Sequence, residues 1–161
     1  MNRHLWLLLG AMGCAPVAAV LDPPLAQLNR WNHALPAEIA AEPVSSPCDA
    51  ANPACRRLHG LRAAACMEQA MAARAPRAAC PGLAARPMLD CATAGYEQAR
   101  AGDASAVLAA NHAQALICLG WLSAPDEAAR LSRAALSAAA SAGPDRAPLL
   151  TLRARELGEA R

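Results

Sequence analysis

The sequence of 161 residues contains no phenylalanine and no lysine, and its aromatic residues are three tryptophans and one tyrosine. Large apolar anchors are therefore scarce, so we expect a thin core of leucine, alanine and methionine in which small side chains bury little surface each. Arginine carries all of the fixed positive charge, and the formal net charge is only +2. A charge this close to neutral argues against a nucleic-acid-binding protein.

The sequence also lacks the short motifs that usually carry catalysis or bind cofactors. It contains no Gly-x-Ser-x-Gly, no phosphate-binding loop, no His-Glu-x-x-His and no Cys-x-x-Cys. Cys55 and His59 stand one helical turn apart, but no further residue completes a metal-ligand set at a known spacing. Asp90, Glu97 and Asp103 fall in one region, where carboxylates on helix surfaces are usually solvated. We therefore predict a protein that is not an enzyme and holds no metal or cofactor.

The N-terminus has the order of a secretory signal peptide. Arg3 precedes an apolar run over 5–9, and small residues follow up to Val17 and Ala19. We predict cleavage after Ala19, which makes 1–19 the signal. A second interpretation is lipidation at Cys14, and a third is an uncleaved anchor formed by the same apolar segment. Charged residues interrupt every later apolar run, so a signal or lipid anchor would be the only membrane contact.

Six further cysteines follow the predicted signal, and an even set of cysteines behind an export signal indicates an oxidising compartment. We therefore predict at least two disulfides and a periplasmic or secreted protein, in which bridges compensate for the thin core. The candidates are Cys48, Cys55, Cys66, Cys80, Cys91 and Cys118.

The spacing of these cysteines leaves the pairing open. Cys55 and Cys66 are 11 residues apart, as are Cys80 and Cys91, so each pair would lie on one helix face. Two antiparallel helices would then pair Cys55 with Cys91 and Cys66 with Cys80, although Pro81-Gly82 interrupts the second helix. A rival scheme has the pairs Cys48–Cys55, Cys66–Cys80 and Cys91–Cys118.

The remaining sequence predicts an all-α fold of antiparallel helical hairpins, arranged as a repeat-like array or a small bundle. Residues 20–54 are rich in proline and form a lead-in with one short helix, and 55–161 form the helical domain. Apolar spacing, capping residues and helix-ending glycines and prolines define the individual helices. We predict them over 25–35, 55–74, 88–101, 105–122, 126–141 and 145–159.

Part of the helical domain, mainly 88–142, resembles a tetratricopeptide or Sel1-like repeat. The segment 113–122 contains small residues followed by Leu-Gly and a bulky residue, as in the first helix of such repeats, and 126–135 is similar to the second helix. The resemblance implies that Gly120 allows two helices to approach closely and that Trp121 is at least partly buried beside it. A generic alanine-rich bundle is the alternative.

In such repeats the first helices line a concave groove that binds protein. The resemblance therefore implies a binding or scaffold module of the cell envelope with a protein partner. Its candidate contacts are Asn111, His112, Gln114, Leu116 and Trp121. The alternative function is that of a disulfide-stapled bundle acting as an inhibitor, an immunity-type protein or an envelope lipoprotein.

One segment carries an excess of positive charge. Residues 51–90 contain six arginines against two acids, an excess of four positive charges, and Arg56, Arg57 and His59 cluster near one helix start. Such a cluster suits an acidic partner or anionic head groups, or it forms the solvated face of a helix.

Overall fold

The computed structural model describes residues 22–49 and 51–160, and the predicted signal with Cys14 lies outside them. Within these residues the chain forms seven α-helices and one 3-10 helix, and no strand, which confirms the all-α class. No helix in this part of the chain combines the length and apolarity needed to cross a membrane. The elements are α3 (Pro23–Trp31), α4 (Pro36–Ala41), α5 (Pro53–Ala72), η1 (Leu83–Ala85), α6 (Arg86–Arg100), α7 (Ala106–Trp121), α8 (Pro125–Ala139) and α9 (Ala147–Glu159).

The proline-rich lead-in contains two short helices, so the prediction of one helix over 25–35 was wrong. The first helix, α3, ends at Trp31. Pro36 then begins α4, because proline suits the first turn of a helix and forces the residue before it out of the helical conformation. Leu35 is accordingly extended, with ψ of 150°.

One carboxylate organises the packing of the lead-in. Glu42, which follows α4, accepts a hydrogen bond from Trp31 Nε1 at 2.6 Å. It also accepts from Arg30 Nη2 at 2.7 Å and from Gln27 Nε2 at 3.0 Å. The bond from Trp31, together with those from Arg30 and Gln27, lowers the pKa of Glu42. The lead-in is therefore a folded layer that packs against α5.

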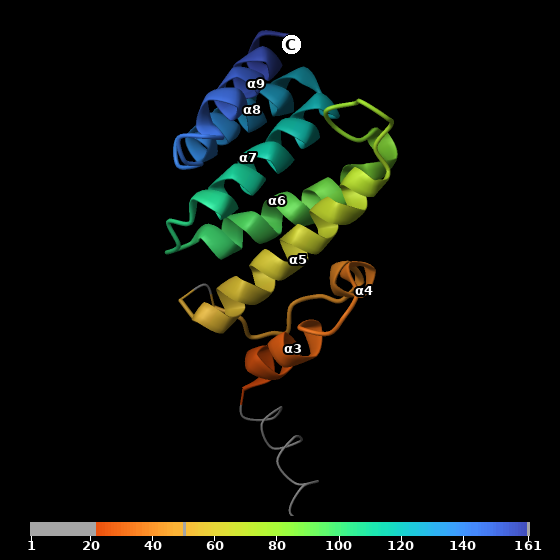
Figure 1. Cartoon of the computed structure of the whole chain (residues 1–161), viewed down its shortest axis with the longest axis vertical. Helices are drawn as coiled ribbons and strands as arrows, with labels where there is room; N and C mark the ends of the chain where they lie inside the picture. Colours follow the sequence, from red (N-terminus) through yellow and green to blue (C-terminus); the bar gives the residue numbers. More distant parts are fainter. Residues whose placement is uncertain (1–21, 50, 161) are drawn as a thin grey trace, which may run out of the picture.

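The helical domain consists of helices that pack in chain order (Figure 1). α5 and α6 form one antiparallel hairpin, and α7 and α8 form a second. α9 packs on α8 and also contacts α7. Contact between alternate helices, in addition to neighbours, is the packing expected of stacked helical hairpins.

Small residues allow α5 and α6 to pack closely. A Cβ atom at Gly95 of α6 would lie 2.9 Å from Ala63 Cβ and 3.0 Å from the His59 carbonyl oxygen of α5. Any side chain at Gly95 would therefore force the two helices apart. The disulfide between Cys66 and Cys91 joins the same two helices.

Glycines also define the contacts of α9, the last helix. A Cβ atom at Gly120 of α7 would collide with the side chain of Leu157 of α9, which confirms that Gly120 is a close helix–helix contact. On the other side, Gly158 faces Ser132 of α8, and a Cβ there would lie 2.9 Å from Ser132 Oγ. Trp121, beside Gly120, has 38% of its surface accessible and is one of the exposed large apolar side chains among the described residues.

All six candidate cysteines form disulfides, in the pairs Cys48–Cys55, Cys66–Cys91 and Cys80–Cys118. The corresponding Cα–Cα distances are 5.4, 6.0 and 5.1 Å, within the range that disulfides span. The first pair agrees with one of the two predicted schemes. The pairings Cys55–Cys91, Cys66–Cys80 and Cys91–Cys118 were wrong.

The connection between α5 and α6 explains the corrected pairing. Cys80 lies in this connection, outside any helix, because Pro81-Gly82 follows it directly. The connection brings Cys80 to Cys118 of α7. Cys66 is then free to pair with Cys91 across the α5–α6 interface.

Candidate binding site

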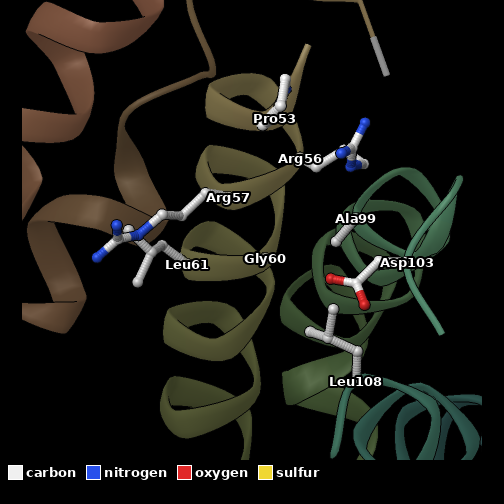
Figure 2. Close-up of a pocket in the computed structure, with 8 residues that line it drawn as sticks. All are labelled: Pro53, Arg56, Arg57, Gly60, Leu61, Ala99, Asp103 and Leu108. Atoms are coloured by element: carbon white, nitrogen blue, oxygen red, sulfur yellow. The ribbon is translucent and has the colours of Figure 1, made fainter. Parts of the chain in front are cut away.

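A hollow with a volume of about 440 Å³ lies along the N-terminal half of α5. We call it the α5 groove. Figure 2 shows that its lining comes from α5 on one side and from α6, the α6–α7 loop and α7 on the other. The lining residues are Pro53, Arg56, Arg57, Gly60, Leu61, Ala99, Asp103 and Leu108.

The helical period explains why five α5 residues line one groove. Positions three and four apart on a helix share a face, and the α5 lining follows this spacing from Pro53 to Leu61. Proline suits the first helical position, and the side chain of Asn52 accepts a hydrogen bond from the Ala54 N–H at 2.9 Å. The start of α5 is thereby fixed, and with it the positions of the groove residues.

The two arginines point to different sides of α5 (Figure 2). Arg57 extends with Leu61 towards the lead-in, whereas Arg56 lies on the side of α6 and the α6–α7 loop. Arg56 Nη1 also donates a hydrogen bond to the Ala51 carbonyl oxygen at 3.0 Å. Arg57 is exposed, and none of the described carboxylates forms an ion pair with it.

One carboxylate, that of Asp103, also lines the groove. Its Oδ1 accepts a hydrogen bond from the Ser105 N–H at 2.8 Å, just before α7. Ser105 in turn caps α7, since its Oγ accepts from the Leu108 N–H at 3.4 Å. Asp103 therefore stabilises the loop before α7. Because two arginines and this one carboxylate line the groove, the groove carries a net positive charge.

The residues predicted to contact a partner do not form one exposed surface. Asn111 and Gln114 have hydrogen-bond partners within the chain, at or near α9. Asn111 Oδ1 accepts from Arg146 Nη1 at 3.4 Å, and Gln114 Oε1 accepts from Arg153 Nη1 at 3.5 Å. Leu116 has only 6% of its surface exposed and lies in the core.

His112 lies elsewhere on α7, between α6 and α8. Its Nδ1 is 3.1 Å from Arg100 Nη1, and its ring centroid is 6.4 Å from that of Tyr96. A guanidinium only donates hydrogen bonds, so Nδ1 must be the unprotonated nitrogen. Burial, followed by the charge of Arg100, lowers the pKa of His112 to about 4. His112 is thus a neutral residue with a partner inside the chain.

The two residues considered as metal ligands are not available together. Cys55 is bonded to Cys48, so it cannot coordinate a metal as a thiolate beside His59. In the described part of the chain, no three residues of the histidine, cysteine, aspartate and glutamate types are placed to hold a metal ion.

The sequence indicated the two arginines of the α5 groove as a positive cluster and Asp103 as one of three acids in one region. Gly60, Ala99 and Leu108 were missed because they come from three helices, and their proximity depends on the α5–α6 crossing. Comparisons with protein-family models, with curated proteins and with solved structures give no match. The resemblance to tetratricopeptide and Sel1-like repeats therefore stays a prediction.

Proposed function

We propose that this protein is a binding module that acts outside the cytoplasm and recognises a protein partner through the α5 groove. The observation that carries the proposal is the lining of this groove, which combines two guanidinium groups with apolar carbon atoms. Binding sites are typically concave and largely apolar, with a few polar groups that fix orientation.

The surrounding disulfides support a binding role, because they hold the groove in one shape. Cys48–Cys55 ties the start of α5 to the lead-in, and Cys66–Cys91 joins α5 to α6 beyond the groove. A site on rigid helices loses less conformational entropy on binding than a site on mobile loops.

The chemistry of the groove favours recognition over catalysis. Its ionisable side chains are Arg56, Arg57 and Asp103. Guanidinium groups remain protonated at any physiological pH, so they bind anions but do not exchange protons. Asp103 is engaged by the Ser105 N–H, and the groove contains no nucleophile beside a base.

Three disulfides indicate an oxidising location outside the cytoplasm. We place the protein more narrowly in the periplasm or among secreted proteins. The support for this is the apolar N-terminal segment that precedes Val17 and Ala19. The same segment would supply a lipid anchor if Cys14 is modified.

Site-specific photo-crosslinking tests the proposal. A photoreactive amino acid replaces Arg57 at the groove or, as a matched control, Arg133, which is exposed on α8. We expect one protein adduct from position 57 and none from position 133, and the adduct's partner, once identified and purified, should bind the wild-type protein. No protein adduct from position 57, or turnover of a small substrate that depends on a groove residue, would contradict the proposed function.

A further inference from the structure

Gly60 is the one groove residue whose identity the packing does not explain. A Cβ atom there would lie 3.5 Å from Ala99 Cβ and 3.8 Å from Leu108 Cδ2, which are ordinary van der Waals distances. Gly95 and Gly120 are different, since a Cβ at either would come too close to a neighbouring helix. A methyl group at Gly60 would therefore fit without moving α6 or α7.

Glycine in a helix interior is also unfavourable, because it loses more conformational freedom on folding than alanine does. Gly60 stands well inside α5, which runs from Pro53 to Ala72. Because Gly60 has no side chain, the floor of the α5 groove at this position consists of backbone atoms. The groove has room for a guest at this point because position 60 contributes only backbone.

The two arginines flank Gly60 on the surface of α5. Arg57 and Leu61 lie on one side of Gly60, and Arg56 lies on the other (Figure 2). Ala99 and Leu108 provide apolar carbon atoms on the Arg56 side, where the carboxylate of Asp103 also lies. A matching guest would carry an apolar group in the middle and a negative charge at each side.

We propose that the α5 groove binds an acidic peptide segment of the partner protein, with one aliphatic side chain over Gly60 and flanking carboxylates at Arg56 and Arg57. This inference rests on the proposed function. Guanidinium groups form charge-assisted hydrogen bonds with carboxylates. From Pro53 to Leu61 the helix rises about 12 Å, which three to four residues of an extended peptide span.

The arrangement of the charges favours a peptide over a lipid head group. A fatty acid or a phospholipid presents its charge at one end of its apolar part, whereas the arginines lie on both sides of the apolar floor. The carboxylate of Asp103 lies beside Ala99 and Leu108 (Figure 2) and repels anions on that side of the groove, so the stronger contact should be to Arg57.

Fluorescence anisotropy with labelled seven-residue peptides tests this proposal. The probe has a central Glu-Leu-Glu, and the comparison peptides have Gln-Leu-Gln or Glu-Gly-Glu in its place. We expect the disulfide-bonded protein to bind the probe at least tenfold more tightly than either comparison peptide. The affinity should also fall as salt is raised, because exposed charges are screened.

Three variants separate binding from folding. Gly60→Leu should weaken binding of the probe at least tenfold by filling the floor, and its thermal midpoint, measured alongside, shows whether the variant is folded. Arg57→Glu should weaken binding to a similar degree. If Gly60→Leu does not fold, Arg57→Glu alone tests whether the probe binds in the groove. The control Arg133→Glu makes the same charge change at an exposed residue of α8 and should leave the affinity for the probe unchanged.

The proposal is overturned if Glu-Leu-Glu and Gln-Leu-Gln bind equally, or if folded Gly60→Leu and Arg57→Glu bind as the wild type does. Binding to phosphatidylglycerol vesicles but to none of the peptides would assign the groove to lipid instead. If photo-crosslinking identifies a protein partner but acidic peptides do not bind, the proposed acidic character of the bound segment is wrong, while the proposed function stands. If no partner is found, the proposed function itself fails.

Discussion

The side chain of Leu157 in α9 lies directly over the backbone of Gly120 in α7, where the glycine leaves room for it. Leu157 is fully buried, and it belongs to the helix that ends the described array. This contact holds α9 to a helix that is not its neighbour in the chain. Gly120 therefore contributes to the packing of α9, in addition to the contacts of α9 with α8.

Replacing Gly120 with valine should therefore destabilise the protein by about 1–3 kcal/mol through overpacking. Urea unfolding followed by circular dichroism measures the change. Gly82→Ala is the control, because a Cβ at Gly82 meets nothing within 4 Å and its φ is −79°. Gly143 is unsuitable, since its φ of +80° makes any side chain there strained. Equal effects of the two changes would show that Gly120 is not a close contact in solution.

The disulfides should contribute unequally to stability. A bridge restricts the unfolded chain more when it closes a longer loop. Cys80–Cys118 has a sequence separation of 38 and Cys48–Cys55 one of 7. Replacing both cysteines by alanine should then cost about 4 kcal/mol for the first pair and about 2 kcal/mol for the second.

Thermal melts of the two double variants, made without reducing agent, measure this difference. Peptide mapping of the non-reduced protein should yield the linked pairs Cys48–Cys55, Cys66–Cys91 and Cys80–Cys118. A map containing Cys66–Cys80 would contradict the path of the α5–α6 connection described above.

Acid should destabilise the protein partly through His112. Its folded-state pKa is lowered to about 4, whereas the ordinary value is 6.5, so the unfolded chain takes up a proton first as the pH falls. The stability that the neutral ring confers is complete above pH 6.5 and is lost towards pH 4. His112→Gln cannot titrate at this position. Between pH 7 and pH 4 its free energy of unfolding should therefore fall less than that of the wild type, by on the order of 2 kcal/mol.

Urea unfolding of the wild type and of His112→Gln at pH 7, 5 and 4 checks this expectation. Other acid-sensitive groups, including His59 and Glu42, are common to both proteins and cancel in the comparison. Parallel pH profiles would mean that the ring of His112 is solvated in the folded protein.

Gly60→Ala should stabilise the protein by roughly 0.5–1 kcal/mol, because alanine is the better helix former and its methyl group fits at ordinary distances. The change is opposite in sign to that expected at Gly95, where a Cβ would lie 2.9 Å from Ala63 Cβ. Chemical denaturation of both variants measures the contrast. A loss of stability in Gly60→Ala would mean that packing alone requires the glycine.

Most helices of the domain could be predicted because their signals are local. α7 begins at Ala106, one residue after the predicted start, and Pro125 begins α8 one residue before the predicted start. The break between α3 and α4 was missed, although Pro36 marks it in the sequence. Local signals thus located the helices to within a few residues.

The disulfide pairing and the groove could not be predicted, because both depend on which helices meet. The spacing of Cys80 and Cys91 indicated a shared helix face, but Pro81-Gly82 places Cys80 in a connection. The arginines of the groove were visible as a charge cluster. Its apolar floor at Gly60 depends on the crossing of α5 with α6 and on the start of α7.

The most direct test of the account is isothermal titration of the photo-crosslinked partner, once purified, against the disulfide-bonded wild type, Gly60→Leu and Arg133→Glu. We expect the wild type and Arg133→Glu to bind with the same affinity, and folded Gly60→Leu to bind at least tenfold more weakly. Equal affinities for all three proteins would contradict the central claim that the α5 groove is the binding site.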